Sequence, residues 1–132
     1  MILLALALIA AQPASACGPG TALPERLRPW ADPGAALVVG GSAVLAAGPG
    51  GRAEAEVEIG EAGAYSIALD QPGWIDLAPA AGAPLRSTTH RHGPRCSTIR
   101  KIVSFDLRPG RHRLVLTRLT GPMAKVMLVR GR

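Results

Sequence analysis

The chain has 132 residues and a formal net charge of +6, so it is a basic protein of about one domain's length, which excludes a large multidomain enzyme. Its 16 glycines and 12 prolines recur too often for the long helices of a bundle. Apolar residues make up 48% of the sequence, which is enough for a small core and excludes wholesale disorder.

The N-terminus has the features of a secretory signal peptide. Residues 2–11 are an unbroken apolar run, too short to span a bilayer and typical of the central region of such a signal. Ala14-Ser15-Ala16 follows, with the small residues that signal peptidase accepts. We therefore expect residues 1–16 to be removed, no transmembrane helix in the mature chain, and a periplasmic or secreted location. A buried N-terminal helix is the competing interpretation.

Cleavage after residue 16 makes Cys17 the first residue and leaves it two fates. Two cysteines in a small exported domain usually bond, which predicts a disulfide between Cys17 and Cys96, the only cysteines of the chain. Closing this loop stabilises the fold by about 4 kcal/mol in the chain-entropy model. The alternative is a lipid anchor at Cys17, although Ala14 stands where lipoprotein signals prefer leucine.

The first third of the remaining chain is irregular. Residues 17–34 hold four prolines and predict an irregular lead-in, with Trp30 as an anchor. Residues 35–47 are apolar but interrupted by Gly40-Gly41, which predicts a weak pair of strands. A turn is expected directly after them.

From residue 53 onward, apolar and polar residues alternate, as is typical of strands with one buried face. The fourth of the expected strands places Ile99 on the same face as Val103 and Phe105. His112 falls in an inward position of the fifth, which predicts a hydrogen-bonded core histidine. The expected strands cover residues 53–59, 65–69, 73–77, 99–107, 112–116 and 124–128.

Two stretches repeat a scheme of strand, glycine turn and alternating strand. They are residues 57–69 and 106–116, in which Gly63 corresponds to Gly110. Turns of this chemistry, spaced about every ten residues, predict hairpins in an all-β fold. We expect a small antiparallel β-sandwich or partly open barrel over residues 35–132.

Positive charge is concentrated at the C-terminal end. Residues 1–85 carry three arginines against eight acids, whereas residues 86–132 carry twelve Lys and Arg against Asp106 alone. In an exported protein, such a surface predicts an acidic envelope component (a glycan or anionic lipid headgroups) or an acidic protein as partner. Nucleic acid is disfavoured by the compartment, and because Phe105 is the only aromatic residue of the basic part. Arginine-rich composition is the competing explanation.

Residues 87–101 concentrate the groups that can carry chemistry. His90 and His92 are two apart, so in an extended backbone both imidazoles leave the same face. Together with a Cys96 thiolate they suit copper or zinc. The competing interpretation is an exposed loop fixed by the Cys96 disulfide. The cations expected to contact an anionic partner are Arg91, Arg95, Arg100 and Lys101.

A metal site needs further donors. His112 or Met127 would complete a copper or zinc shell, while a non-haem iron site needs a carboxylate, for which Asp76 and Asp106 are nearest in sequence. Core packing is the simpler role for His112 and Met127, and a surface or hydrogen-bonded role is the simpler one for the acids. The sequence contains no nucleophile elbow, P-loop or dinucleotide fingerprint.

Gly73-Trp74-Ile75-Asp76 and the run HRHGPRCSTIRK at residues 90–101 resemble a family of small exported bacterial β-sandwich proteins that has no characterised activity. Some members carry an automatic homogentisate 1,2-dioxygenase name, although that enzyme is several times longer and builds its iron site within a cupin. If the family's loop is functional, the resemblance implies His90, His92 and Cys96 as its site residues.

The sequence thus predicts an exported β-sandwich that serves as a binding or accessory module. It would contact a metal or an anionic ligand through residues 86–101. Two other classes stay open: a small metal-dependent enzyme that uses His90 and His92 with a carboxylate, and a purely structural envelope protein.

Overall fold

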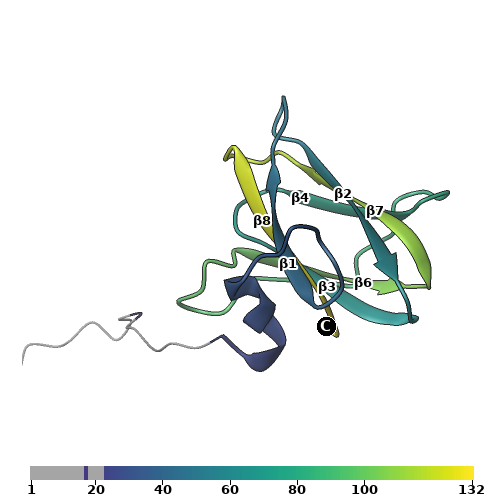
Figure 1. Ribbon diagram of the computed structural model, residues 1–132, viewed down its shortest axis with the longest axis horizontal. Helices are drawn as coiled ribbons and strands as arrows, with labels where there is room; N and C mark the ends of the chain where they lie inside the picture. Colours follow the sequence, from purple (N-terminus) through teal and green to yellow (C-terminus); the bar gives the residue numbers. More distant parts are fainter. Residues whose placement is uncertain (1–16, 18–22) are drawn as a thin grey trace, which may run out of the picture.

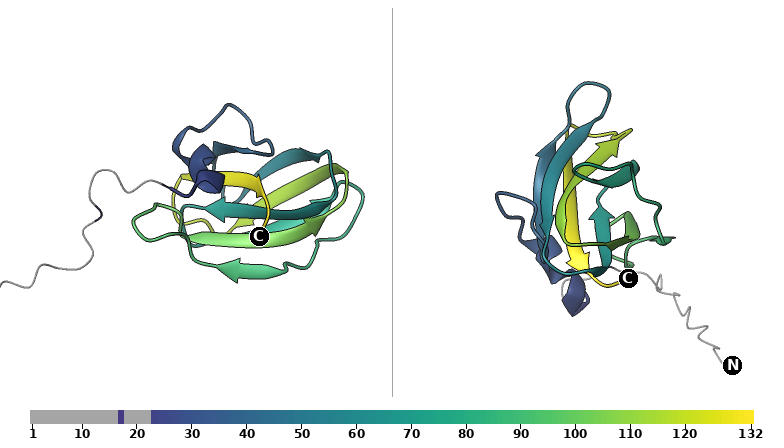
Figure 2. Two further views of the ribbon diagram at one scale, coloured as in Figure 1. Left: turned by 90° about the horizontal axis from the view of Figure 1, so that it is seen from below. Right: turned by 90° about the vertical axis from the view of Figure 1, so that its right-hand side faces the viewer.

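The computed structural model describes Cys17 and residues 23–132; the expected signal peptide, residues 1–16, lies outside the described residues. Two antiparallel sheets pack face to face (Figures 1 and 2), so the prediction of a small all-β sandwich is confirmed, and no closed barrel is formed. No helix of the described part is long and apolar enough to cross a membrane.

The five-stranded sheet has the strand order β1-β8-β3-β6-β5, and the three-stranded sheet has the order β2-β7-β4. The strands are β1 (Gly41–Ala46), β2 (Ala53–Ile59), β3 (Gly63–Leu69), β4 (Trp74–Pro79), β5 (Thr89–Arg91), β6 (Lys101–Leu107), β7 (Gly110–Thr117) and β8 (Met123–Arg130).

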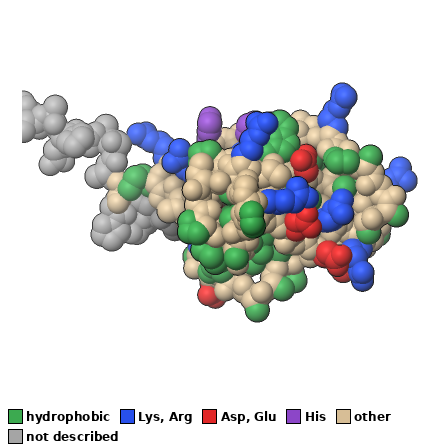
Figure 3. All heavy atoms as spheres, turned by 90° about the horizontal axis from the view of Figure 1, so that it is seen from above, with side chains coloured by type: hydrophobic (Ala, Val, Ile, Leu, Met, Phe, Trp, Pro, Cys, Tyr) green, Lys and Arg blue, Asp and Glu red, His purple; other side chains and the backbone are tan. Residues whose placement is uncertain are grey.

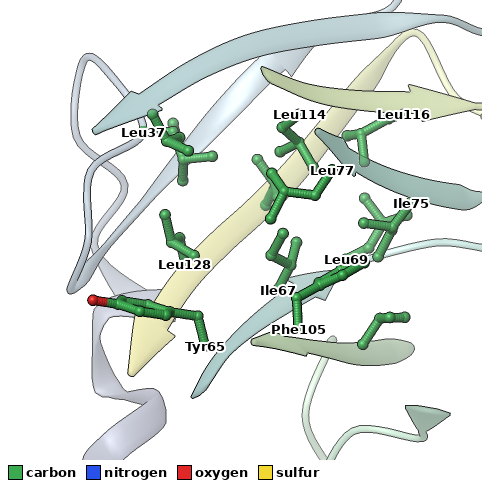
Figure 4. Packing of buried hydrophobic residues seen from close by; sticks show 14 of the residues in the cluster. Leu37, Tyr65, Ile67, Leu69, Ile75, Leu77, Phe105, Leu114, Leu116 and Leu128 are labelled. Carbon is green, nitrogen blue, oxygen red and sulfur yellow. The ribbon is translucent and has the colours of Figure 1, made fainter. Parts of the chain in front are cut away.

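The main core fills the space between the two sheets. Alternate residues of each strand point into it, as the period-two pattern predicts. Figure 4 shows Ile67 and Phe105 from one sheet facing Leu77 and Leu114 from the other. All four side chains are at most 1% exposed, and full burial of such a side chain stabilises the fold by about 2 kcal/mol.

The two stretches with the repeated scheme are arches, and the prediction of hairpins was wrong. β2 lies in the three-stranded sheet and β3 in the five-stranded sheet, while β6 and β7 are divided in the same way. The arches stack on each other, because β2 pairs with β7 and β3 pairs with β6. Gly63 and Gly110 begin the strands after the crossings with φ of 155° and 130°, a region that favours glycine.

A second, smaller cluster covers the outer face of the five-stranded sheet. The 3-10 helix η1 (Glu25–Ala31) lies there with Leu27 and Trp30 buried, so the irregular lead-in contains a regular element. Trp30 is the expected anchor: it is 3% exposed, and its indole Nε1 donates to Thr98 Oγ1 at 2.9 Å. Ile99 was expected on the same inward face as Val103, and this prediction was wrong. Ile99 precedes β6 and belongs to the outer cluster.

The apolar segment at residues 35–47 forms one strand, β1, where a pair was expected. Ahead of β1 the chain makes only isolated bridges, between Gly34 and Ala43 and between Val39 and Leu128. Gly40 has a φ of 79° and turns the chain into β1, so the glycines that were expected to separate two strands mark the start of one.

Candidate functional site

The segment expected as a loop contains the short edge strand β5, and this strand positions two functional side chains on opposite faces. His90 lies opposite Val103 and Arg91 opposite Ile102 in the antiparallel pairing with β6. Directly opposed residues share a face of the sheet. His90 therefore lies on the side of the main core, at its open edge, whereas Arg91 lies on the outer side near η1.

The two predicted histidines line one hollow of about 300 Å³, which we call the histidine hollow. His92 follows directly after β5, and both imidazoles are exposed. Arg100 and Lys101 complete the set of basic groups. Its lining residues are Gln71, Pro72, Gly73, His90, His92, Arg100 and Lys101. The described lining thus contains four basic side chains and no carboxylate.

Gln71 is 9% exposed and fixes the wall of this hollow. Its side-chain Oε1 accepts from the backbone N–H of Thr120 at 2.9 Å and of Gly121 at 3.0 Å. Its Nε2 donates to the carbonyl of Met123 at 2.9 Å. One buried amide thus joins the β3–β4 loop to the β7–β8 loop, so the wall of the hollow is held in place from both sheets.

Lys101 connects the histidine hollow to an exposed tryptophan. Its Nζ donates to the carbonyl of Gly73 at 2.6 Å and lies 5.3 Å from the centroid of the Trp74 ring, within cation–π distance. The indole Nε1 in turn donates to Asp76 Oδ1 at 3.1 Å. A smaller hollow of about 80 Å³ adjoins the first and is lined by Trp74, Ile75, Ser87, His90, Lys101 and Val103.

Trp74 was not among the predicted site residues, although a signal for it exists in the sequence. Ile75 and Leu77 point inward, so the alternation places Trp74 outside, where it is 55% exposed. Tryptophan, with an apolar ring and a polar N–H, is enriched at interfaces, so its exposed position beside basic groups makes Trp74 a candidate contact residue.

The loop between β5 and β6 folds back on itself, and this brings Arg100 beside the histidines. Gly93 lies so close to Ile99 that a Cβ atom would be 2.1 Å from the Ile99 carbonyl oxygen, so only glycine fits. The turn closes through the backbone N–H of Ser97, which donates to the carbonyl of Pro94 at 3.2 Å. Cys96 in this turn has a φ of 64°, a region that favours glycine.

Cys17 and Cys96 form a disulfide, with 5.1 Å between their Cα atoms, as predicted. Cys96 therefore has no thiolate to offer a metal, and the sulfur of Cys17 is not free to carry a lipid. Within residues 23–132 and Cys17, no three His, Cys, Asp or Glu side chains lie together as a metal site requires.

The other donors considered for a metal site have structural contacts of their own. His112 is 3% exposed, with Nδ1 3.1 Å from the carbonyl oxygen of Gly110, as expected for a core histidine. Met127 is fully buried in the cluster under η1. Asp76 accepts from Trp74, and Asp106 lies 3.5 Å from the Arg132 guanidinium.

The four predicted anion-contacting cations do not act as one group. Arg100 and Lys101 lie together at the histidine hollow. Arg95 lines a separate hollow beside Trp30. Arg91 lines a third hollow, of about 360 Å³, on the other face of β5.

Arg26 joins Arg91 in that third hollow and was missed in a lead-in expected to be irregular. Burial, and then the positive charge of Arg91, lower the pKa of Arg26 below its usual range. Arg26 Nη1 also donates to the carbonyl oxygen of Arg132. Two guanidinium groups close enough to repel each other make this a second basic feature beside β5.

The cations near the histidine hollow are without ion pairs among the described residues. The four ion pairs of the described residues lie away from the hollow and involve Arg52, Arg111, Arg130 and Arg132. The first acid of the chain is Glu25, so residues 1–24 supply no carboxylate side chain. Figure 3 shows histidine and Lys or Arg side chains beside one another along one edge of the molecule.

Comparison of the sequence with protein-family models finds no match, and comparison with curated proteins finds none either. The resemblance to exported β-sandwich proteins therefore stays a hypothesis, and the geometry of the site is what bears on function.

Proposed function

We propose that this protein is an exported β-sandwich binding module that holds an anionic ligand at the histidine hollow. The observation that carries the proposal is the lining of this hollow, where four basic side chains meet and no carboxylate neutralises them. Arg100 and Lys101 place two positive charges side by side in this lining, and an anion in the hollow offsets their repulsion.

Two features support export. The apolar run at residues 2–11 has the length of a signal-peptide core. The Cys17–Cys96 disulfide fits an oxidising compartment, because cytosolic thiols are kept reduced. These two features together support a periplasmic or secreted location.

The test uses an anionic probe and two matched arginine variants. Tripolyphosphate is titrated into the isotope-labelled protein at low salt, and the shifts of the backbone amides at residues 89–93 and 99–103 are followed by NMR. Arg100→Gln should weaken binding about fivefold, since a charged hydrogen bond contributes roughly 1–2 kcal/mol.

Arg108→Gln is the control for this experiment. Arg108 is exposed and follows the opposite end of β6, about 25 Å from Arg100 at the rise of a strand, so it removes the same charge far from the hollow. Equal losses of affinity in the two variants would show that only net charge matters and would refute a site.

Metal capture by His90 and His92 is the second candidate, favoured by the fact that both imidazoles line one hollow. Two imidazoles leave a copper or zinc shell incomplete, because Cys96 is in the disulfide. Calorimetry with zinc and with copper(II) separates the candidates: tight one-to-one binding lost in His92→Ala favours the metal. The dioxygenase name carried by some members of the resembling family would require an iron site of two histidines and a carboxylate. No three His, Cys, Asp or Glu side chains are gathered in this way among the described residues.

A further inference from the structure

The aromatic ring beside the basic hollow indicates the class of anion. Trp74 is 55% exposed, and two contacts favour one orientation of its ring: its Nε1 donates to Asp76, and the Lys101 ammonium lies over the ring. Holding an exposed side chain in one conformation lowers the entropy cost of binding. The surface therefore presents a flat, apolar ring with a favoured orientation next to a cation.

The Trp74 ring and the cations form one continuous surface along the open side of the sandwich. Trp74 is on β4, the edge of the three-stranded sheet, and His90 is on β5, the edge of the five-stranded sheet. His90 and Lys101 line both the histidine hollow and the smaller hollow at Trp74. A ligand bridging the two hollows would thus meet an aromatic ring at one end and Arg100 and His92 at the other.

A sugar ring matches the Trp74 ring better than a bilayer does. The C–H face of a pyranose is flat and apolar and packs against an indole, while its substituents remain available to polar groups. Membrane surfaces are bound by several apolar side chains that project together. The other large apolar side chains exposed in the described part are Val38, Val44 and Met123, which lie on or before β1 and on β8.

We propose that the ligand of this surface is an acidic polysaccharide of the uronic-acid type. One sugar ring packs against Trp74 and places its carboxylate at the Lys101 ammonium, and the carboxylate of a neighbouring sugar reaches Arg100 and the histidines. This inference rests on the proposed function, since it assigns a ligand class to the same hollow.

The test is calorimetry with hexagalacturonate at low salt, with its methyl ester as the uncharged analogue. The expected result is that the protein binds the acid, and that it binds the methyl ester at least tenfold more weakly. Trp74→Ala should weaken binding of the acid about tenfold, whereas Met123→Ala, which also truncates an exposed apolar side chain, should leave it within twofold. Because Trp30 is buried, acrylamide quenching reports on Trp74. This quenching should fall when hexagalacturonate is added and covers the ring.

The outcomes separate this inference from the proposed function. Binding of tripolyphosphate or phosphatidylglycerol vesicles that depends on Arg100, without binding of hexagalacturonate, overturns the polysaccharide and leaves the anion site standing. The same holds if Trp74→Ala binds hexagalacturonate as the wild type does. If no anionic probe distinguishes Arg100→Gln from Arg108→Gln, both proposals fall. Thermal melts of each variant check that the fold is intact.

Discussion

Cys17 is joined to Cys96 across 79 residues of sequence, and this bond ties the segment ahead of η1 to the loop that returns Arg100 to the histidines. The bond lies on the outer side of the five-stranded sheet, close to Trp30 and Thr98, where η1 is anchored. Its contribution is therefore both to global stability and to the placement of the basic loop.

Removal of the disulfide should lower the free energy of unfolding by about 4 kcal/mol, because the open chain regains the entropy of a long loop. Urea denaturation of the Cys17→Ser/Cys96→Ser double variant measures this loss. The Cys17→Ser/Cys96→Gly variant should regain about 1 kcal/mol of the lost free energy of unfolding, since Cys96 has a φ of 64° that glycine adopts without strain. Unchanged stability in the serine variant would contradict the assignment of this bond.

Gln71→Met should destabilise the fold by about 3 kcal/mol, since a side chain of similar volume leaves two N–H groups and a carbonyl without partners. Thermal denaturation measures the loss. Thr120→Ala is the control, because its hydroxyl lies 3.5 Å from the Gln71 oxygen, at the limit of a hydrogen bond. It should cost less than about 0.5 kcal/mol. Equal effects would mean that Gln71 does not hold the two loops together.

Thr89→Val should stabilise the protein by about 1 kcal/mol. The Thr89 hydroxyl is buried and has no hydrogen-bond partner among the described residues, so the isosteric valine removes an unsatisfied polar group. The same substitution at Thr98 has the opposite expected sign, because the Thr98 hydroxyl accepts from Trp30 at 2.9 Å. Chemical denaturation of both variants checks the pair, and a destabilised Thr89→Val would show that the hydroxyl is satisfied.

The hydrogen bond and charge of Arg130 hold the pKa of Glu61 below its usual range. A depressed carboxyl pKa means that the pair stabilises the fold at neutral pH, and that this contribution is lost as pH falls through the folded-state pKa. Carbon-detected NMR titration of Glu61 should give a midpoint that rises in Arg130→Gln. Arg111→Gln, which removes an exposed cation paired with Glu58, should leave the Glu61 midpoint in place.

The alternation of apolar and polar residues predicted the strands that form the core. Each of these strands has one buried face, so every second residue in it is apolar. It predicted neither β5 nor η1. The three residues of β5 include no aliphatic side chain, and the pairing with β6 supplies what the pattern lacks. Pro29 lies inside η1, where it was taken as a sign of irregular chain, but the helix is short and is held by burial of Leu27 and Trp30.

The arches show a different limit. Gly63 and Gly110 mark correctly where the chain reverses direction. The sequence pattern of such a turn is the same whether the next strand pairs with the previous one in a hairpin or crosses to the facing sheet in an arch. The candidate site has the same dependence on tertiary structure. His90 and His92 were placed together by spacing, while the approach of Trp74 and Lys101 needs two sheets whose edges meet.

The arches also determine when this chain can fold. Only β5 and β6 pair with a neighbour in sequence; β1 waits for β8, β2 and β4 wait for β7, and β3 lies between β6 and β8. In a polypeptide that emerges N-terminus first, the strands β1 to β4 thus have no sheet to join until β6 and β7 are available, because each of them lacks its partner. The first half of the chain therefore has no strand partner until about residue 107, so pairing of its strands comes late in synthesis, and a chain without paired strands is one that a narrow channel can accept.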